Sequence, residues 1–220
     1  MTAILGFIAE EHNEISMFLV SDGLVIWHPK EGNDVAQNEF EKIFRFNNFL
    51  ISFNGEVSFY QTFLDTLKTL NKSISNISEL QDEINKSFPF GKFGNQLGNS
   101  KAKYSNIIIL DISNRTLAHH FAGNVSSNSG CFLPFDFQYL EPNKLYHFGS
   151  KVSFMNKATG QNEAFAIECN NLIKQTVDKQ IEYFKLFLKE INEAYEGIGD
   201  LHSYYFTDKN GIEYFDKIES

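Results

Sequence analysis

Residues 2–23 read TAILGFIAEEHNEISMFLVSDG, two apolar runs separated by a polar turn. The runs cover residues 2–9 and 15–21, and two short apolar runs around a polar turn are typical of a β-hairpin. Asp22 and Gly23 end the second run, and an Asp-Gly pair favours a further turn because it tolerates positive φ. The sequence therefore predicts a chain that opens with an antiparallel hairpin.

The rest of the chain groups strand-like and helical segments into blocks. Period-2 and period-3.6 apolar patterns separate the two kinds of segment. The further predicted strands cover residues 24–27, 40–46, 49–53, 106–112, 116–121, 201–207 and 212–215. The predicted helices cover residues 57–70, 77–84 and 165–195, the last as one long helix or two consecutive ones. Loops are predicted at 28–34 and 89–103, and an irregular stretch at 122–143.

This order lacks the regular strand–helix alternation of a parallel nucleotide-binding fold. It favours an α+β fold of mostly antiparallel sheets with helices on their outer faces. The chain has 220 residues, of which 42% are apolar, and it contains 23 Phe and 9 Tyr. These numbers are sufficient for a large core, and we expect a single domain over residues 1–220.

The composition also excludes several classes of protein. A net charge of −9 argues against binding to nucleic acid or to anionic lipid. Two cysteines, Cys131 and Cys169, are too few for a disulfide-stapled secreted scaffold. The N-terminus has no basic run before its apolar stretch, and no apolar run approaches the ~18–20 residues of a membrane span. A cytoplasmic protein without membrane or nucleic-acid partners is therefore expected.

Side-chain metal sites and nucleotide-binding motifs are not evident in the sequence. The six histidines are scattered, and His119 and His120 are strand neighbours that should point to opposite faces. Surface or packed histidines are the simpler interpretation, because no ligand spacing is present. The chain also lacks a Gly-x-Gly-x-x-Gly, a phosphate loop and a Gly-x-Ser-x-Gly elbow.

The start of the chain offers a different chemistry. Removal of Met1, which is expected before a small residue, would leave Thr2 as the N-terminal residue of a mature chain 2–220. An α-amine with a pKa near ~7.7–8.0 can take or relay the proton of a hydroxyl on the same residue. Taken alone, Thr2 is more simply the first residue of an ordinary strand.

Several further motifs follow Thr2 in order along the chain. They are Ser21-Asp22-Gly23, Lys42-Ile43-Phe44-Arg45-Phe46, Ile51-Ser52-Phe53-Asn54-Gly55 before an amphipathic helix, Phe148-Gly149-Ser150 and Gly197-Ile198-Gly199-Asp200-Leu201. The series resembles the proteasome β-subunit family, and particularly its bacterial HslV-type peptidase relative, over nearly the whole chain. The resemblance implies an N-terminal-nucleophile (Ntn) hydrolase fold, a four-layer αββα sandwich of two mostly antiparallel sheets flanked by helices.

The resemblance also implies a role for each matching residue. Thr2 would be the nucleophile that forms an acyl-enzyme with a peptide carbonyl. Lys42 would help to deprotonate its hydroxyl and hold down the pKa of the neighbouring α-amine, and Asp22 would pair with Lys42 and orient it. A surface salt bridge of little energetic value is the alternative for that pair. The Gly55 N–H would form the oxyanion hole, and Ser150 would belong to a proton relay.

Assembly and ions follow from the same resemblance. In HslV-type relatives, backbone carbonyls hold a monovalent cation, and the matching positions are Gly199, His202 and Tyr205. A sodium ion there is possible on this basis, and no other cofactor is required. The expected assembly is a homo-oligomer of stacked rings that cleaves peptides or unfolded proteins, with an ATPase unfoldase as a possible partner.

Three departures and two alternatives remain open. The segment between Asp22 and Lys42 is longer than is usual in the family, Lys151 follows Ser150 in place of glycine, and the helical region is longer. An inactive structural subunit of the same fold is one alternative. The other is an Ntn enzyme with a different acyl acceptor, such as a peptide ligase or a small-amide hydrolase.

Overall fold

The computed structural model divides the chain into two compact units. Unit 1 comprises Met1–Phe44 and Glu141–Ser220, and unit 2 comprises Arg45–Leu140. The structure describes residues 3–11, 14–23, 25–27, 35–37, 40–70, 73–90, 105–121, 134–149, 171–194, 199, 201–208 and 210–218.

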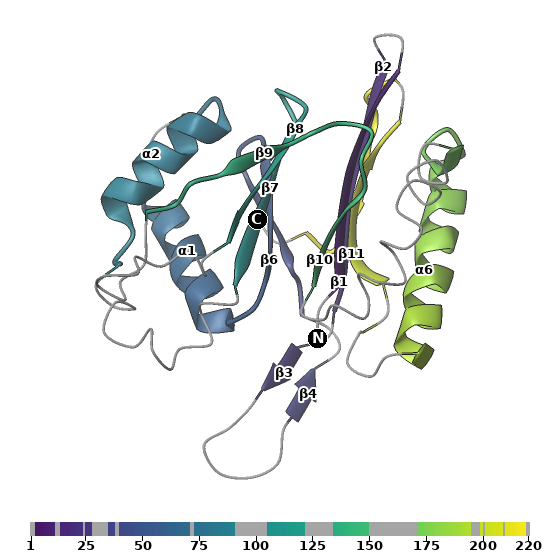
Figure 1. The fold of residues 1–220 in the computed structure, drawn as a ribbon, viewed down its shortest axis with the longest axis horizontal. Helices are drawn as coiled ribbons and strands as arrows, with labels where there is room; N and C mark the ends of the chain where they lie inside the picture. Colours follow the sequence, from purple (N-terminus) through teal and green to yellow (C-terminus); the bar gives the residue numbers. More distant parts are fainter. Residues whose placement is uncertain are drawn as a thin grey trace. The chain divides into compact units, whose positions relative to one another are not determined.

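Unit 1 contains a five-stranded sheet in the order β10-β1-β2-β11-β12 (Figure 1). All four strand pairings are antiparallel. The strands are β1 (Ala3–Glu11), β2 (Glu14–Asp22), β10 (Tyr146–Gly149), β11 (Leu201–Thr207) and β12 (Glu213–Asp216). The predicted opening hairpin is confirmed, with Ile4 opposite Ser21 and Glu11 opposite Glu14.

Helix α6 (Val177–Ala194) packs against one face of this sheet. Alternate residues of β1 and β2 point to that face, as the period of a strand requires. Phe184 lies at the centre of the contact, with its ring centroid 4.8 Å from that of Phe18 and 6.0 Å from that of Phe206. The buried cluster consists of Leu5, Phe7, Ala9, Phe18, Val20, Leu145, Leu172, Ile173, Phe184, Leu188 and Phe206.

The helical region predicted at residues 165–195 is interrupted before α6. Residues 171–172 are helical, 173–175 form a turn, and α6 begins at Val177. The buried Gln180 side chain donates from Nε2 to the carbonyls of Ile173 (3.3 Å) and Gln175 (3.1 Å). These bonds satisfy carbonyls that have no helical partner at a helix end. Of the two predicted possibilities, one long helix or two consecutive ones, the described part of this region shows two consecutive helical segments.

Unit 2 contains the second sheet, in the order β5-β6-β7-β8-β9. The pairings of β6 with β7, β7 with β8 and β8 with β9 are antiparallel. The strands are β5 (Ile43–Phe46), in which the chain passes from unit 1 to unit 2, β6 (Phe49–Asn54), β7 (Asn106–Asp111), β8 (Thr116–Phe121) and β9 (Gln138–Leu140).

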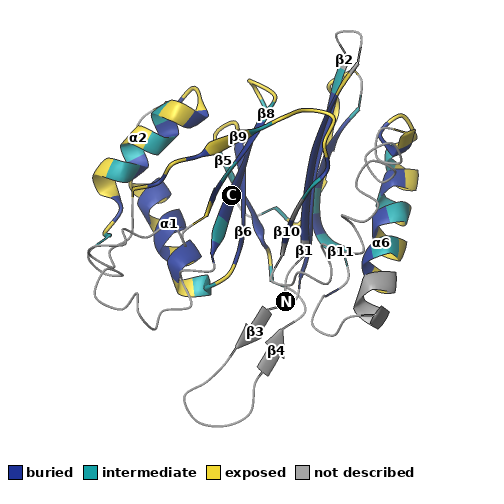
Figure 2. Cartoon of the chain, viewed as in Figure 1, coloured by how far each residue is buried: buried dark blue, intermediate teal, exposed yellow. Residues whose placement is uncertain are grey.

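Helices α1 (Val57–Thr69) and α2 (Ile77–Ser87) belong to unit 2 and match the predicted helices. Tyr60 of α1 stacks on Phe53 of β6 with ring centroids 3.7 Å apart, and its hydroxyl donates to the Ile51 carbonyl. Helix α2 buries Ile77, Leu80 and Ile84 and exposes its other side (Figure 2).

A two-stranded antiparallel ribbon is the third group of strands among the described residues. It pairs β3 (Val25–Trp27) with β4 (Val35–Gln37). Sequence patterns predict neither β4 nor β9, because three residues are too few to show a period. Strand β9 therefore corrects the prediction of an irregular stretch at 122–143. Strand β4 follows the loop predicted at 28–34, which lies outside the described residues.

The predicted fold class is confirmed, since two mostly antiparallel sheets each carry their own helices. Within unit 1 the sheet packs against α6, and within unit 2 the sheet packs against α1. The single domain over residues 1–220 stays a prediction. Among the described residues, no helix combines the length and the apolar character that a membrane crossing requires.

Candidate active site

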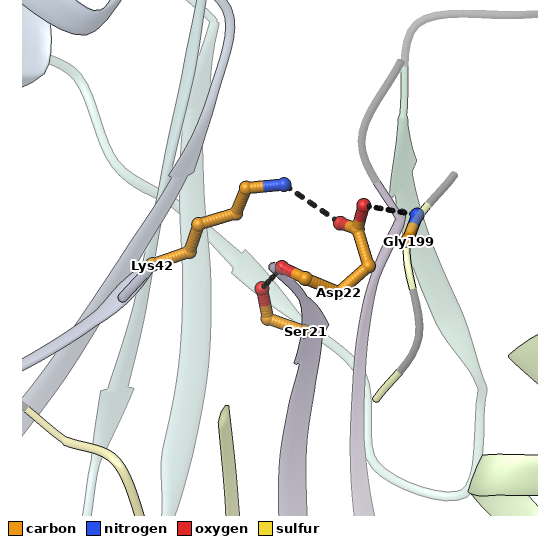
Figure 3. A network of polar contacts seen from close by, with 4 residues as sticks. All are labelled: Ser21, Asp22, Lys42 and Gly199. Atoms are coloured by element: carbon orange, nitrogen blue, oxygen red, sulfur yellow. Dashed lines mark hydrogen bonds and ion pairs between the residues drawn. The ribbon is translucent and has the colours of Figure 1, made fainter. Parts of the chain in front are cut away.

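A buried ion pair joins Asp22 and Lys42 in unit 1. Asp22 is the last residue of β2, and Lys42 stands directly before β5. Lys42 Nζ lies 2.8 Å from Asp22 Oδ1, and the two side chains are 1% and 0% exposed (Figure 3). Two of the predicted site residues are therefore in contact, and a surface salt bridge does not describe them.

A backbone hydrogen bond closes the segment that separates the two residues. The Phe40 N–H donates to the Gly23 carbonyl over 3.0 Å. This bond ties the residue two before Lys42 to the residue directly after Asp22. The unusual length of the intervening segment therefore does not loosen the ion pair.

Asp22 accepts a second hydrogen bond from a distant part of the chain. The Gly199 N–H donates to Oδ2 over 2.9 Å, and this contact is buried. Ser21 Oγ donates to the backbone carbonyl of Asp22 over 2.8 Å. Each carboxylate oxygen thus has its own donor, which fixes the orientation of the group (Figure 3).

Burial changes the acid–base chemistry of Lys42. Loss of water lowers the pKa of the Lys42 ammonium below its usual value, and the charge of Asp22 and its hydrogen bond oppose that change. Taking two charges out of water is costly, and well-packed apolar residues often serve stability as well or better. Stability alone is therefore a poor explanation for this pair.

Ser203 adds a hydroxyl that sequence patterns do not single out. It lies opposite Ser21 in the pairing of β11 with β2, and both serines are fully buried. Ser203 Oγ has no hydrogen-bond partner among the described residues. A hydroxyl can both donate and accept, so it is suited to passing a proton. The feature of the sequence that could have indicated Ser203 is a serine within a strand rich in tyrosine and phenylalanine.

Gly55 lies in unit 2, on the turn between β6 and α1. Its φ is +114°, and a Cβ added there would lie 2.5 Å from Ser105 Cα. The turn is held by Ser105 Oγ, which accepts the Glu56 N–H over 3.0 Å. Asn54 Oδ1 accepts both the backbone and side-chain N–H groups of Asn106, at 3.1 and 2.7 Å. The backbone here therefore requires glycine, whatever its catalytic role.

Thr2 and Ser150 lie outside the described residues, so their roles stay predictions. Strand β1 is described from Ala3, and Ile4 pairs with Ser21, the neighbour of Asp22. Asp22 therefore lies beside the beginning of β1.

Two of the three predicted cation ligands, His202 and Tyr205, lie in β11, and Gly199 precedes that strand. Tyr205 pairs with Leu19 on one side and Phe215 on the other, so its carbonyl lies within the sheet. A hard cation needs several oxygens that converge on one point. The Gly199 contact to Asp22 uses its N–H and gives no evidence on its carbonyl. The cation at Gly199, His202 and Tyr205 stays a prediction, and no step depends on it.

The histidines and acidic residues give no side-chain metal site in the described ranges. No group of three or more His, Cys, Asp or Glu residues gathers there to hold an ion. His120 is instead a packed residue, because its Nδ1 accepts the Asp136 N–H over 3.1 Å. Burial lowers the pKa of His120 to about 4.

Comparison with known proteins gives matches among solved structures. Thiobacillus denitrificans BPH aligns with a TM-score of 0.50 and 13% sequence identity, covering 94% of this chain and 98% of that chain. The complex of Thiobacillus denitrificans BPH with Epoxomicin has a TM-score of 0.49 at the same identity and coverage. Eukaryotic HslV from Trypanosoma brucei has a TM-score of 0.38 and 13% identity, covering 72% of this chain and 77% of that chain.

No family model matches the chain, and a search of curated protein sequences gives no match either. At 13% identity, the similarity to uncomplexed BPH is one of fold. The chemistry of this chain must therefore be argued from its own residues.

Proposed function

We propose that this chain is an N-terminal-threonine hydrolase that cleaves peptide bonds with Thr2 as nucleophile. The observation that carries the proposal is the buried ion pair of Asp22 and Lys42 beside the beginning of β1. Asp22 ends β2, and β2 pairs with β1, the first strand of the chain. The ion pair is therefore well placed to assist proton transfer at the N-terminal residue.

The proposed reaction has two halves. The Thr2 hydroxyl attacks the peptide carbonyl carbon while its proton passes to the α-amine, with Lys42 supporting the transfer and Asp22 orienting Lys42. The Gly55 N–H is the proposed donor to the oxyanion, and Ser150 is the proposed relay near the amine. The C–N bond then breaks, the leaving amine takes the proton, and an ester remains on the threonine.

Water completes the reaction. It attacks the ester carbonyl and gives a proton to the α-amine, and the C–O bond to the threonine then breaks. The threonine oxygen recovers a proton and the carboxylic acid leaves. This half separates a hydrolase from an enzyme with another acyl acceptor, because in the latter an amine would take the place of water.

The assembly and partners of the enzyme belong to the same proposal. A homo-oligomer of rings, peptide or unfolded-protein substrates, an ATPase partner and a cytoplasmic location rest on the sequence and its resemblance. The fold likeness to BPH is compatible with them.

Covalent labelling tests the nucleophile. An epoxyketone such as Epoxomicin is the probe, because this reagent class requires both the hydroxyl and the free amine of one residue. We expect intact mass spectrometry to show loss of Met1 and one Epoxomicin adduct per chain. Thr2→Ser, which keeps both groups, should be labelled, and Thr2→Ala should not. Retention of Met1, or labelling that survives Thr2→Ala, would contradict the proposal.

Lys42 is tested by peptide hydrolysis. We expect Lys42→Ala to lower turnover about 10²–10⁴-fold, the usual contribution of a proton-transfer group, without loss of assembly in size-exclusion chromatography. Lys86→Ala is the matched control, because that lysine pairs with Glu83 but is 68% exposed. Equal turnover in the two variants would remove Lys42 from the mechanism, whereas a wild type without turnover above background would favour an inactive structural subunit.

A further inference from the structure

Asp22 is held from two sides, and only one of them belongs to the proposed reaction. Oδ1 faces Lys42 Nζ, whereas Oδ2 accepts the N–H of Gly199, a residue far away in the sequence. The resemblance uses Gly199 only through its carbonyl. The N–H contact is therefore an additional role for this residue.

We infer that Gly199 is a positioning residue, whose backbone N–H fixes the Asp22 carboxylate so that Oδ1 stays directed at Lys42. This inference rests on the proposed function of the ion pair. The terminal torsion of an aspartate is broad, so a carboxylate with one partner can rotate. A second, charge-assisted hydrogen bond to the other oxygen removes that freedom.

A bulge in β11 lies three residues after Gly199 in the sequence. Leu201 pairs with Asp22 and Ser203 pairs with Ser21, so the register shifts by one residue at His202. Such a bulge bends the strand and often lies near an active site. Gly199 precedes β11, and its N–H donates to a side chain in place of a strand neighbour.

The contact between Gly199 and Asp22 is buried, which makes its loss costly. Asp22 is fully buried and Gly199 is buried as well. A buried donor that loses its acceptor is left unsatisfied, which makes both groups depend on each other. The segment before β11 and the end of β2 are thereby joined at the ion pair.

Two variants of Gly199 isolate its N–H. Gly199→Pro removes the donor, whereas Gly199→Ala adds a side chain and keeps it. We expect kcat of the Pro variant to lie about tenfold or more below that of the Ala variant, as loss of one charge-assisted hydrogen bond predicts. KM should agree within about twofold, because the substrate is not the group that moves.

Amide hydrogen exchange gives a second test that does not need a proline. We expect Asp22→Ala to speed exchange at the Gly199 N–H about tenfold or more relative to the N–H of Tyr205 in β11, since the acceptor of the Gly199 N–H is gone. Lys42→Ala keeps the acceptor. In this variant the Gly199 N–H should therefore exchange more slowly, relative to Tyr205, than it does in Asp22→Ala.

The outcomes separate the inference from the function it rests on. Absence of Thr2-dependent labelling in the wild type would refute the proposed function. Normal labelling together with equal kcat in the two Gly199 variants would overturn the inference alone. Unchanged exchange at Gly199 in Asp22→Ala would overturn it as well, even where the proline variant does not fold.

Discussion

Replacing Asp22 by Asn tests the energetics of the buried pair. The substitution keeps the shape of the side chain but removes its charge and one of its two acceptors. Both oxygens of Asp22 face donors, Lys42 Nζ and the Gly199 N–H, so an amide must turn its own NH₂ group towards one of them. Lys42, which is 1% exposed, is left without its counter-charge from Asp22.

Two estimates of the cost agree. Removing one partner of a buried ion pair destabilises a protein by about 3–5 kcal/mol. Alternatively, Lys42 loses its proton in the folded state, and deprotonating a lysine of pKa about 10.4 at pH 7 costs about 4.6 kcal/mol. We therefore expect Asp22→Asn to lower the free energy of unfolding by about 4 kcal/mol at pH 7.

The pH dependence identifies the cause. Burial already lowers the pKa of Lys42, and losing the attraction of Asp22 lowers it further. The unfolded chain then binds one more proton than the folded one, so stability rises with pH by about 1.4 kcal/mol per unit below the unfolded pKa. The deficit of Asp22→Asn against the wild type should therefore shrink between pH 7 and pH 10.

Urea unfolding at fixed protein concentration measures this deficit. Asp111→Asn is the matched control, because Asp111 is fully buried and its two oxygens accept N–H groups of Asn114. That variant should lose stability without the same dependence on pH. A loss below about 1 kcal/mol in Asp22→Asn, the value of a surface pair, would refute the reasoning. A deficit that does not change with pH would do so too.

Three further predictions concern the stability of each unit. Gly55→Ala should destabilise the chain by more than the ~1–2 kcal/mol expected for positive φ, because its Cβ would meet Ser105; Gly211→Ala is the control in urea unfolding, with φ +77° and nothing within 4 Å. The free energy of unfolding should fall as the pH drops from 6.5 towards 4, because the pKa of His120 is lowered to about 4 in the folded state and the unfolded state binds the extra proton. His120 contributes at most about 3 kcal/mol to this fall. His120→Asn should make the free energy of unfolding less dependent on pH in this range. Phe184→Ala should cost about 3–5 kcal/mol, measured by thermal unfolding, and a loss below about 1 kcal/mol would contradict its central place in the core.

Sequence patterns predict the long elements of this chain well. The opening hairpin and helices α1 and α2 lie where apolar periods place them, because each buries one side of a regular element. Strands β4 and β9 could not be found this way, since three residues show no period. The helix interruption before α6 is stabilised by the side chain of Gln180, a residue type common inside helices.

Some contacts of the candidate site could be predicted from the sequence, and others could not. The contact of Asp22 with Lys42 follows from the family resemblance, because local spacing alone does not bring the two residues together. The Gly199 N–H could not be predicted as a donor, since every residue except proline has one. Ser203 depends on the register of β11 against β2, which includes a bulge that no residue type in the strand announces.

The hydrogen bond between Phe40 and Gly23 has an evolutionary consequence. The bond holds Phe40 beside Gly23, so the positions of these two residues do not depend on the length of the segment between them. Doubling the length of such an excursion costs only about 0.6 kcal/mol in closure entropy. Residues 24–39 are therefore free to lengthen, shorten or acquire a new binding task while the lysine and the aspartate keep their distance.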